Sequence, residues 1–445
     1  MKKVKTKRTP KDQESLIRKA QKDLEIEYLR RFKFYTDSLI GAEHFEKLDK
    51  TWMKTIYQFR MRMPNFIFKD SSAFSPQMQK FMKSYLDKAL KEMNSEVELN
   101  GKHLKMDEYL VTWQTYTKLF PDLVYRDLFN KYPNLEASFM EKLATKDSEG
   151  SSLLVLLHIL MHISHQMSSP RKIVNLRYET VFEEFMYAKV LKQVIYASIY
   201  YPEFRNFNIN SKHRPAQRFG LNELFGKFQW FSFTGKQLGL KNESENQIFE
   251  VFIQNHAVLR FAERMQGCRN YEVSIYLYYS FDSAEIVRYK NTYLVSYYFT
   301  DYKLGYFVGE IVENCFLIKT FLFLTQLNTP EGDALSEKLG TSIHDIEYLN
   351  IGKLSTFIEM NSKSADEMYE HFSGTGCESI LEFKKEFFDI FARDSNKEIS
   401  LTKYLNLDKT DAELDELLES KADELGYNFR NLRFEKALKV KVMKS

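Results

Sequence analysis

One short segment combines residues that suit acid–base chemistry with residues that bind phosphate. It reads His256-Ala-Val-Leu-Arg260-Phe-Ala-Glu263-Arg264, and on a helix the offsets of 0, +4, +7 and +8 place its four polar side chains along one face. His256 would lie in the first turn, where free N–H groups attract an anion, and could act as general acid or base. Arg260 and Arg264 could hold a scissile phosphate, with Glu263 as the second acid–base partner or as the group that orients an arginine. The segment therefore predicts metal-independent phosphodiester cleavage.

The same spacing also permits a non-catalytic interpretation. Glu263 follows Arg260 by three residues, the separation at which opposite charges pair on a helix surface. The four residues would then form a solvated ion-pair surface with no reaction to perform. Spacing alone favours this second interpretation, and both stay open.

The segment resembles the HAxxRxxER signature of BrnT-like toxins, which are small members of the RelE-like ribonuclease group. His256-Ala257, Arg260 and Glu263-Arg264 match that signature, although the glycine that usually follows the final arginine is displaced to Gly267. In that family the helix precedes a short antiparallel sheet, and the resemblance here covers residues 248–325. It implies RNA cleavage by the matched residues, with cations of the sheet joining the active site. The basic candidates in this region are Arg288, Lys290, Lys303 and Lys319.

Three histidines form a second constellation. His158, His162 and His165 have offsets of 0, +4 and +7, which places them on one helix face, and an i, i+4 pair is a geometry in which helices bind Zn²⁺. The segment has no cysteine or carboxylate, so a fourth ligand would have to come from elsewhere. We therefore expect hydrogen-bonded histidines at a helix interface. We assign no metal and no other cofactor, and these three residues are the weak candidates for a metal site.

Both ends of the chain are strongly charged. Residues 1–11 carry six cations and no acid, residues 408–424 hold eight acids against two lysines, and the last 18 residues are basic again. The first segment could contact nucleic acid or an acidic protein through counterion release. The alternative is a solubilising terminus. The candidates for nucleic-acid binding are Lys2, Lys3, Lys5, Lys7 and Arg8.

The composition excludes several classes of protein. The 445 residues include 64 Lys plus Arg and 61 Asp plus Glu, and the net charge of +3 cannot bind nucleic acid in bulk as a histone does. No run reaches the roughly 18 apolar residues of a transmembrane helix. The three cysteines, Cys268, Cys315 and Cys377, have neither a disulfide framework nor zinc spacing. We expect a cytoplasmic protein of two or three packed units, with no membrane partner.

The elements that must position these residues are predicted from apolar periodicity and turn signals. We expect an α+β, predominantly helical fold, in which helical regions flank a small antiparallel β-α-β-β-β unit. In that unit, strands are expected at 248–253, 292–300, 305–312 and 316–324, and a helix at 255–267. A further helix is expected at 178–201. The expected domains are a basic arm at 1–11, a helical domain at 12–201 with an Asn100-Gly101 hairpin near 97–105, a connecting segment at 202–247, a RelE-like α+β unit at 248–328 and a C-terminal helical region at 329–445.

Two functions from different classes follow from these patterns. The first is an RNA-binding protein whose toxin-like unit supplies metal-independent endoribonuclease activity. The second is a non-enzymatic structural or interaction protein, from a phage or another mobile element, whose helices and charged ends bind other proteins. A ribonuclease should cut RNA without added metal and lose that activity on His256→Ala, whereas a scaffold should not cut at all.

Overall fold

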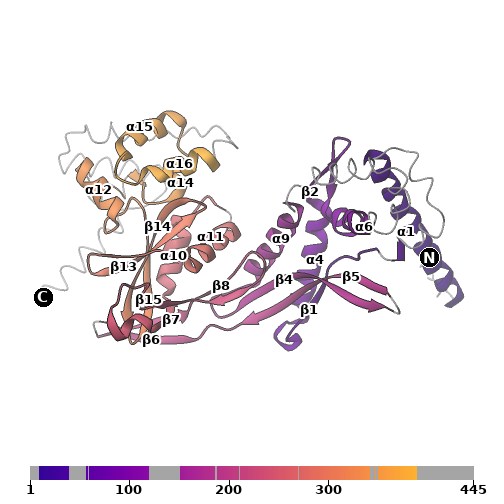
Figure 1. Ribbon diagram of the computed structural model, residues 1–445, viewed down its shortest axis with the longest axis horizontal. Helices are drawn as coiled ribbons and strands as arrows, with labels where there is room; N and C mark the ends of the chain where they lie inside the picture. The colour runs from indigo at the N-terminus through magenta and orange to yellow at the C-terminus, as the bar shows by residue number, and fades with distance from the viewer. Residues whose placement is uncertain are drawn as a thin grey trace, which may run out of the picture. The chain divides into compact units, whose positions relative to one another are not determined.

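The computed structural model describes residues 10–39, 57–58, 60–119, 151–185, 188–209, 211–268, 270–340, 346 and 349–387 (Figure 1). The chain divides into two compact units. The first unit comprises the residues up to 202 together with 220–229, and the second comprises 203–219 and the residues from 230 onward. Within the described ranges, no helix is both long enough and apolar enough to cross a membrane.

The first unit has an aromatic core enclosed by helices. Tyr35 packs edge-on against Trp113 at 5.3 Å between ring centroids and against Tyr116 at 5.5 Å. Helices α1 and α4 begin at a proline, which fits the first turn, and α4 follows the N-cap Ser75, whose side chain accepts a hydrogen bond from the Met78 N–H. The helices are α1 (Pro10–Leu39), α4 (Pro76–Glu92), α5 (Met106–Glu108), α6 (Gln114–Leu119) and α9 (Ser151–Met167), with a π-helical turn at Tyr109–Trp113.

The strands of the first unit form one three-stranded sheet and two small hairpins. The sheet has the order β1-β5-β4, in which β1 is parallel to β5 and β4 is antiparallel to it. The predicted hairpin is confirmed, because Asn100 and Gly101 have φ values of 51° and 75° and join two paired strands. The strands are β1 (Asn65–Phe68), β2 (Asn94–Leu99), β3 (Lys102–Lys105), β4 (Ile173–Phe185), β5 (Ala188–Tyr200), β8 (Gly220–Asn222) and β9 (Phe228–Trp230).

The prediction that 12–201 is a helical domain is wrong at its C-terminal end, from residue 173 to residue 200. The helix expected at 178–201 is replaced by the paired strands β4 and β5, whose register is continuous from Ile173↔Tyr200 to Phe185↔Ala188. Valines, isoleucines and tyrosines, which fit a pleated surface, dominate this segment. Val174 and Leu176 are buried, and α9 packs on β4 from that side. Strand pairing and burial on both faces of the paired segment therefore outweigh the helical spacing read from the sequence.

The second unit is built on an eight-stranded mixed sheet of order β12-β13-β14-β15-β11-β7-β6, with β10 also paired to β11. The pair β11 and β15 is parallel, and the other pairs are antiparallel. The strands are β6 (Phe204–Ile209), β7 (Lys212–Arg218), β10 (Ser232–Thr234), β11 (Ile248–Ile253), β12 (Ile286–Tyr289), β13 (Thr292–Phe299), β14 (Tyr302–Val312) and β15 (Cys315–Phe323).

Helices cover this sheet at two places. Helices α10 and α11 pack on the sheet through aromatic rings. Helices α12, α14, α15 and α16 gather at the end of the sheet opposite the hairpin of β6 and β7 (Figure 1). The helices are α10 (Asn255–Arg264), α11 (Asn270–Asp282), α12 (Pro330–Leu339), α14 (Leu354–Ile358), α15 (Ser362–Phe372) and α16 (Glu378–Phe387).

The α+β class is confirmed, but the predominantly helical fold with one small β unit is wrong. In the expected unit at 248–328, the four strands and the first helix are found at the predicted places. Its expected order β-α-β-β-β omits α11 and β12, and its sheet is mixed rather than antiparallel. The expected connecting segment at 202–247 instead supplies β6, β7 and β10 to the sheet. This segment shows little of the alternation between apolar and polar residues that predicts strands, because an exposed hairpin buries few apolar side chains.

The C-terminal region beginning at 329 is helical in its described part, as expected. Thr329 caps α12 by accepting a hydrogen bond from the Gly332 N–H at 2.9 Å, and Pro330 occupies the first turn. The acidic segment at 408–424, the basic tail and residues 1–9 of the basic arm lie outside the described residues, whereas residues 10 and 11 of the arm belong to α1.

Candidate nucleic-acid interface

Helix α10 has a fixed orientation on the sheet. It starts directly after β11, where the Gln254 N–H donates to the Ile318 carbonyl at 3.0 Å. Ala257, Phe261 and Met265 are buried, which is the i, i+4, i+8 spacing of one helical face. The Phe261 ring lies about 5 Å from three rings of the sheet, those of Tyr297, Phe307 and Phe321.

The four residues of the predicted catalytic face lie along α10 in unlike environments. His256 is exposed in the first turn. Arg260 Nη1 lies 2.7 Å from Glu263 Oε2, and both side chains are about half exposed, so Glu263 holds Arg260 as the non-catalytic interpretation expects. Arg264 is partly buried, and its Nη1 atom has no hydrogen-bond partner. Burial, with Arg260 nearby, lowers the pKa of Arg264 to about 10.

The lysines of the sheet carry matched charges. Lys290 lies 2.7 Å from Asp333, Lys303 2.8 Å from Glu331, and Lys319 2.7 Å from Glu310, in each case between ammonium nitrogen and carboxylate oxygen. Arg288 lies 6.0 Å from the centre of the Tyr293 ring. The three lysines that the toxin resemblance offers to an active site are therefore already neutralised within the chain.

One of the three histidines of α9, His162, contacts α4. The His162 ring stacks on Tyr85 at 5.5 Å between centroids. Burial and the neighbouring His162 lower the pKa of His165. No cluster of three or more metal-ligating side chains occurs among the described residues. The proposed phosphate-binding lysines and arginine of the basic arm, Lys2, Lys3, Lys5, Lys7 and Arg8, lie outside them.

The sequence analysis missed the hairpin of β6 and β7, which carries a separate basic surface. Its register is regular, with Phe207 opposite Arg214 and Arg205 opposite Ala216. Because side chains alternate between the two faces of a strand, four cations share the face that carries the buried Phe207. We call this surface the cation face, and it consists of Arg205, Lys212, Arg214 and Arg218.

At the base of the hairpin these cations are engaged. Arg205 Nε lies 2.6 Å from Glu203, and Glu250 is 3.6 Å from both Arg205 and Arg218. Both guanidinium groups also face the Phe252 ring, at 4.8 and 5.7 Å from its centre. Burial lowers the pKa of Arg218, which donates to the Val251 carbonyl at 3.1 Å. This half of the cation face is therefore part of the fold.

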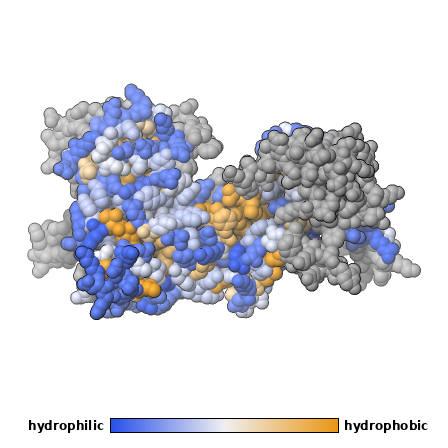
Figure 2. All heavy atoms as spheres, in the orientation of Figure 1, coloured by the Kyte–Doolittle hydropathy of each residue, from blue (hydrophilic) through white to orange (hydrophobic). Residues whose placement is uncertain are grey.

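At the tip of the hairpin the cations are free. Lys212 and Arg214 are exposed, and neither forms an ion pair within the part of the chain that the structure describes. Glu313 brings one carboxylate to the hairpin, where it accepts a hydrogen bond from the Asn208 N–H at 3.3 Å. This end of the unit is mostly hydrophilic (Figure 2). Helix α10 contacts β7 as well as β15, so the predicted catalytic helix and the hairpin are neighbours.

A signal for this hairpin was present in the sequence. The segments on either side of Ser211 place Phe207 and Ala216 at strand spacing from charged residues. In the structure Ser211 has a φ of 62°, as a turn residue does. Pro215 argued against a strand. The structure tolerates it because β11 pairs with β7 only at Gln217 and Arg218, which leaves Pro215 paired on one side.

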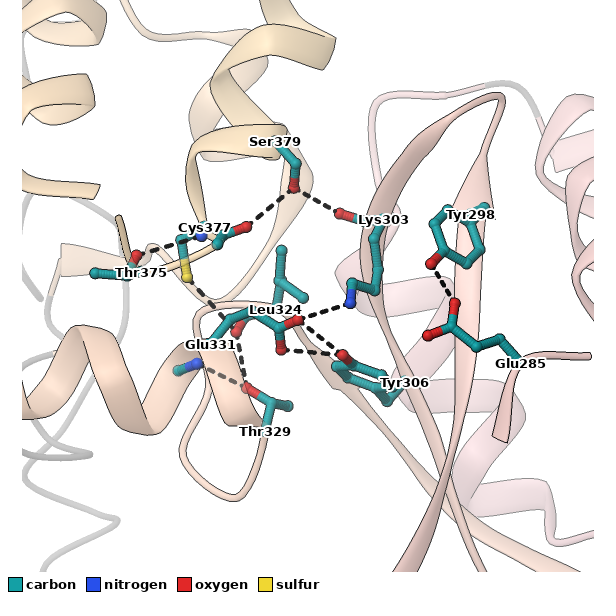
Figure 3. A network of polar contacts seen from close by, with 12 residues as sticks. Glu285, Tyr298, Lys303, Tyr306, Leu324, Thr329, Glu331, Thr375, Cys377 and Ser379 are labelled. Atoms are coloured by element: carbon teal, nitrogen blue, oxygen red, sulfur yellow. Dashed lines mark hydrogen bonds and ion pairs between the residues drawn. The ribbon is translucent and has the colours of Figure 1, made fainter. Parts of the chain in front are cut away.

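A third group of titratable residues centres on Glu331, in the first turn of α12 (Figure 3). The Tyr306 hydroxyl donates to both carboxylate oxygens, at 2.8 and 3.1 Å, while Lys303 lies 2.8 Å from one of them. Burial, then Glu331, raises the pKa of Tyr306, and burial raises that of Cys377 to about 12. These groups stay protonated at neutral pH. The arrangement, which we call the Glu331 network, consists of Glu331, Lys303 and Tyr306 and connects α12 to β14.

Comparisons with protein-family models, with curated proteins and with solved structures find no match to this chain. The likeness to BrnT-like toxins accordingly rests on the motif in α10 and on the order of the strands that follow it.

Proposed function

We propose that this protein binds RNA through the tip of the β6–β7 hairpin. One observation carries the proposal: Lys212 and Arg214 project from the same face of an exposed hairpin with no carboxylate partner among the described residues. Phosphates of a nucleic acid would supply the missing negative charge and release counterions on binding. Since the net charge of the chain is only +3, such a local surface is what a specific electrostatic contact requires.

Metal-independent cleavage at α10 is the second proposal. It is supported by the exposure of His256 and by the contact of α10 with β7, because RNA that passes from Lys212 and Arg214 around the edge strand β6 would reach the side of the sheet on which α10 lies. In this proposal His256 acts as general acid or base. Arg260 would have to exchange Glu263 for a phosphate. A protein that binds without cutting, or one that binds only other proteins, remains the alternative.

A binding experiment tests the first proposal. Labelled RNA is titrated with wild type and with the Lys212→Gln, Arg214→Gln double variant between about 50 and 200 mM salt, the range over which phosphate contacts weaken. We expect the variant to bind at least about tenfold more weakly and its salt slope to fall by about 1.4, since each contact to a single strand contributes about 0.7. Lys236→Gln, Lys241→Gln is the matched control, because both lysines are exposed in the same unit. Equal affinities and slopes for all three proteins would rule out the hairpin as the contact.

Cleavage is measured in the same samples with excess chelator present. Cut ends that appear with wild type and disappear with His256→Ala, Arg260→Ala would support the second proposal. If RNA stays intact while binding persists, the protein binds RNA without cutting it. If no RNA binds, the interaction-protein alternative takes over.

A further inference from the structure

The two faces of the β6–β7 hairpin differ completely in chemistry. The cation face holds every Lys and Arg of the two strands. The opposite face carries no lysine, arginine, aspartate or glutamate, and we call it the amide face. Its residues are Phe204, Asn206 and Asn208 on β6 and His213, Pro215 and Gln217 on β7.

The amide face is open to solvent in a way that suits unpaired bases. Phe204 is 53% exposed, and no other ring of the described chain packs on it. Asn206, Asn208 and His213 are exposed beside it, with side chains that can hydrogen-bond to base edges. An aromatic ring flanked by amides, with cations on the other face of the same hairpin, offers a stacking platform and phosphate contacts to one flexible single strand.

The amide face lies on the same side of the sheet as α10. Gln217 is opposite Ile253, which in turn is opposite Ile318, and α10 packs on that side through Phe261. A helix about 10 Å in diameter therefore borders this face and obstructs the approach of a wide duplex. In a duplex, moreover, each base is covered by its neighbours, so Phe204 would have no base on which to stack.

We infer that the RNA bound at this hairpin is single-stranded, with a base stacked on Phe204 of the amide face and with phosphates of other nucleotides, beyond the edge strand β6, on Lys212 and Arg214 of the cation face. This inference rests on the proposed RNA binding and adds the class of substrate. Residues two apart on β6 are about 7 Å from each other, so Asn206 and Asn208 lie within reach of the bases that follow. The stacking ring and the cations act in separate ways, one on unpaired bases and the other on any phosphate.

The test compares three labelled ligands: a mixed-sequence single-stranded RNA, the same sequence as an RNA duplex, and a DNA duplex. The proteins are wild type, Phe204→Ala, Phe204→Tyr and Phe225→Ala, which removes another phenylalanine that is 54% exposed. We expect Phe204→Ala to weaken single-strand binding about tenfold or more without changing the salt slope. Phe204→Tyr should retain binding because it keeps the ring, and Phe225→Ala should match wild type.

Two outcomes would overturn the inference while RNA binding stands. One is duplex RNA or DNA bound as tightly as the single strand, which for DNA would indicate a β-ribbon in the major groove. The other is a Phe204→Ala protein that binds the single strand as well as Phe225→Ala does. Failure of wild type to bind any RNA is a distinct result, since it removes the proposed function together with the inference.

Discussion

The hairpin tip and the Glu331 network use the same kinds of side chain in opposite ways. In the network, Lys303 lies 2.8 Å from the largely buried carboxylate of Glu331, to which the Tyr306 hydroxyl also donates a hydrogen bond. At the tip, Lys212 and Arg214 are exposed and have no described partner. A cation that the fold needs is thus matched within the chain. A cation left unmatched on an exposed strand is available to a ligand.

The same contrast recurs within each region. Asp333, also in the first turn of α12, is held by Lys290 at 2.7 Å and by the Tyr289 hydroxyl at 2.7 Å. Conversely, the cation face itself changes along its length, since Arg205 and Arg218 at its base are engaged by glutamates. The position of the carboxylates, rather than the number of cations, therefore separates structural from available charge.

The largest effect is expected from removing the carboxylate at the centre of the network. Glu331→Ala should lower the free energy of unfolding by about 3 kcal/mol, because Lys303 and Tyr306 would lose their partner in a place with little access to water. The urea midpoint at unchanged m-value measures this loss. Glu337→Ala, on the exposed side of the same helix, is the control and should change stability by no more than about 0.5 kcal/mol. Equal losses in the two variants would contradict a stabilising network.

A smaller effect is expected at Gly376, which packs against Glu331, and Gly374 serves for comparison. Gly376 has a φ of 86°, and a Cβ there would lie 2.7 Å from the Glu331 Cγ, whereas Gly374 has a φ of 75° with no atom within 4 Å of such a Cβ. Gly374→Ala should cost about 1 kcal/mol from backbone strain, and Gly376→Ala about 2 kcal/mol because Glu331 must also shift. The difference between their thermal midpoints isolates the contact. If Gly374→Ala lowers the thermal midpoint more than Gly376→Ala does, the contact between residue 376 and Glu331 does not limit stability.

The contribution of Asp333, in the first turn of α12, to the free energy of unfolding should depend on pH. Burial alone would raise the pKa of Asp333, but hydrogen bonds from Lys290, the Asn328 N–H and Tyr289 outweigh it, and the net pKa is lowered. The unfolded chain then takes up the proton more readily, so the contribution of Asp333 is complete above the ordinary aspartate pKa and is lost as the pH falls through the lowered one. Asp333→Asn should be about 1 kcal/mol less stable near pH 7, with a smaller difference near pH 3. A difference that is constant with pH would exclude the carboxylate charge as its cause.

The smallest effect is expected at the hairpin tip. Lys212→Gln, Arg214→Gln should leave the free energy of unfolding within about 0.5 kcal/mol of wild type, since neither side chain has a described partner to lose. The measurement is again the urea midpoint, with no RNA present. A loss above about 1 kcal/mol would show that these cations support the fold and would weaken the comparison.

Local signals in the sequence predicted local structure well. Asn100-Gly101 gave the correct hairpin, and the apolar runs around β13, β14 and β15 gave strands close to their observed bounds. Pairing between distant segments was not predictable in this way. The parallel pairing of Ile253 with Ile318 joins two strands that are far apart in the chain, and no signal in either strand specifies it.

The candidate site was predicted only in part. The sequence identified the helix that carries His256 and Arg260, and also the alternative in which Glu263 neutralises Arg260, which is the pair observed. It missed Lys212 and Arg214 because what distinguishes them is that no described carboxylate pairs with them, and this can be seen only in the structure. Charge matching is a property of three-dimensional contacts, and segment composition does not reveal it.

The course of the chain between the two units has a consequence for dissecting the protein. The chain leaves the first unit at 202, returns to it for 220–229 and leaves it again. The returning loop is built in: Asn175 donates to the Asn222 side chain and to the Gly226 carbonyl, both at 2.9 Å, and a Cβ on Gly226 would lie 2.6 Å from the Arg177 Cα. A fragment that stops at 202 would leave the buried amide of Asn175 without these acceptors. No single cut therefore yields two intact units. If a protease cut the exposed hairpin between β6 and β7, the two fragments would stay associated, because β6 pairs with β7 and residues 220–229 pack in the first unit.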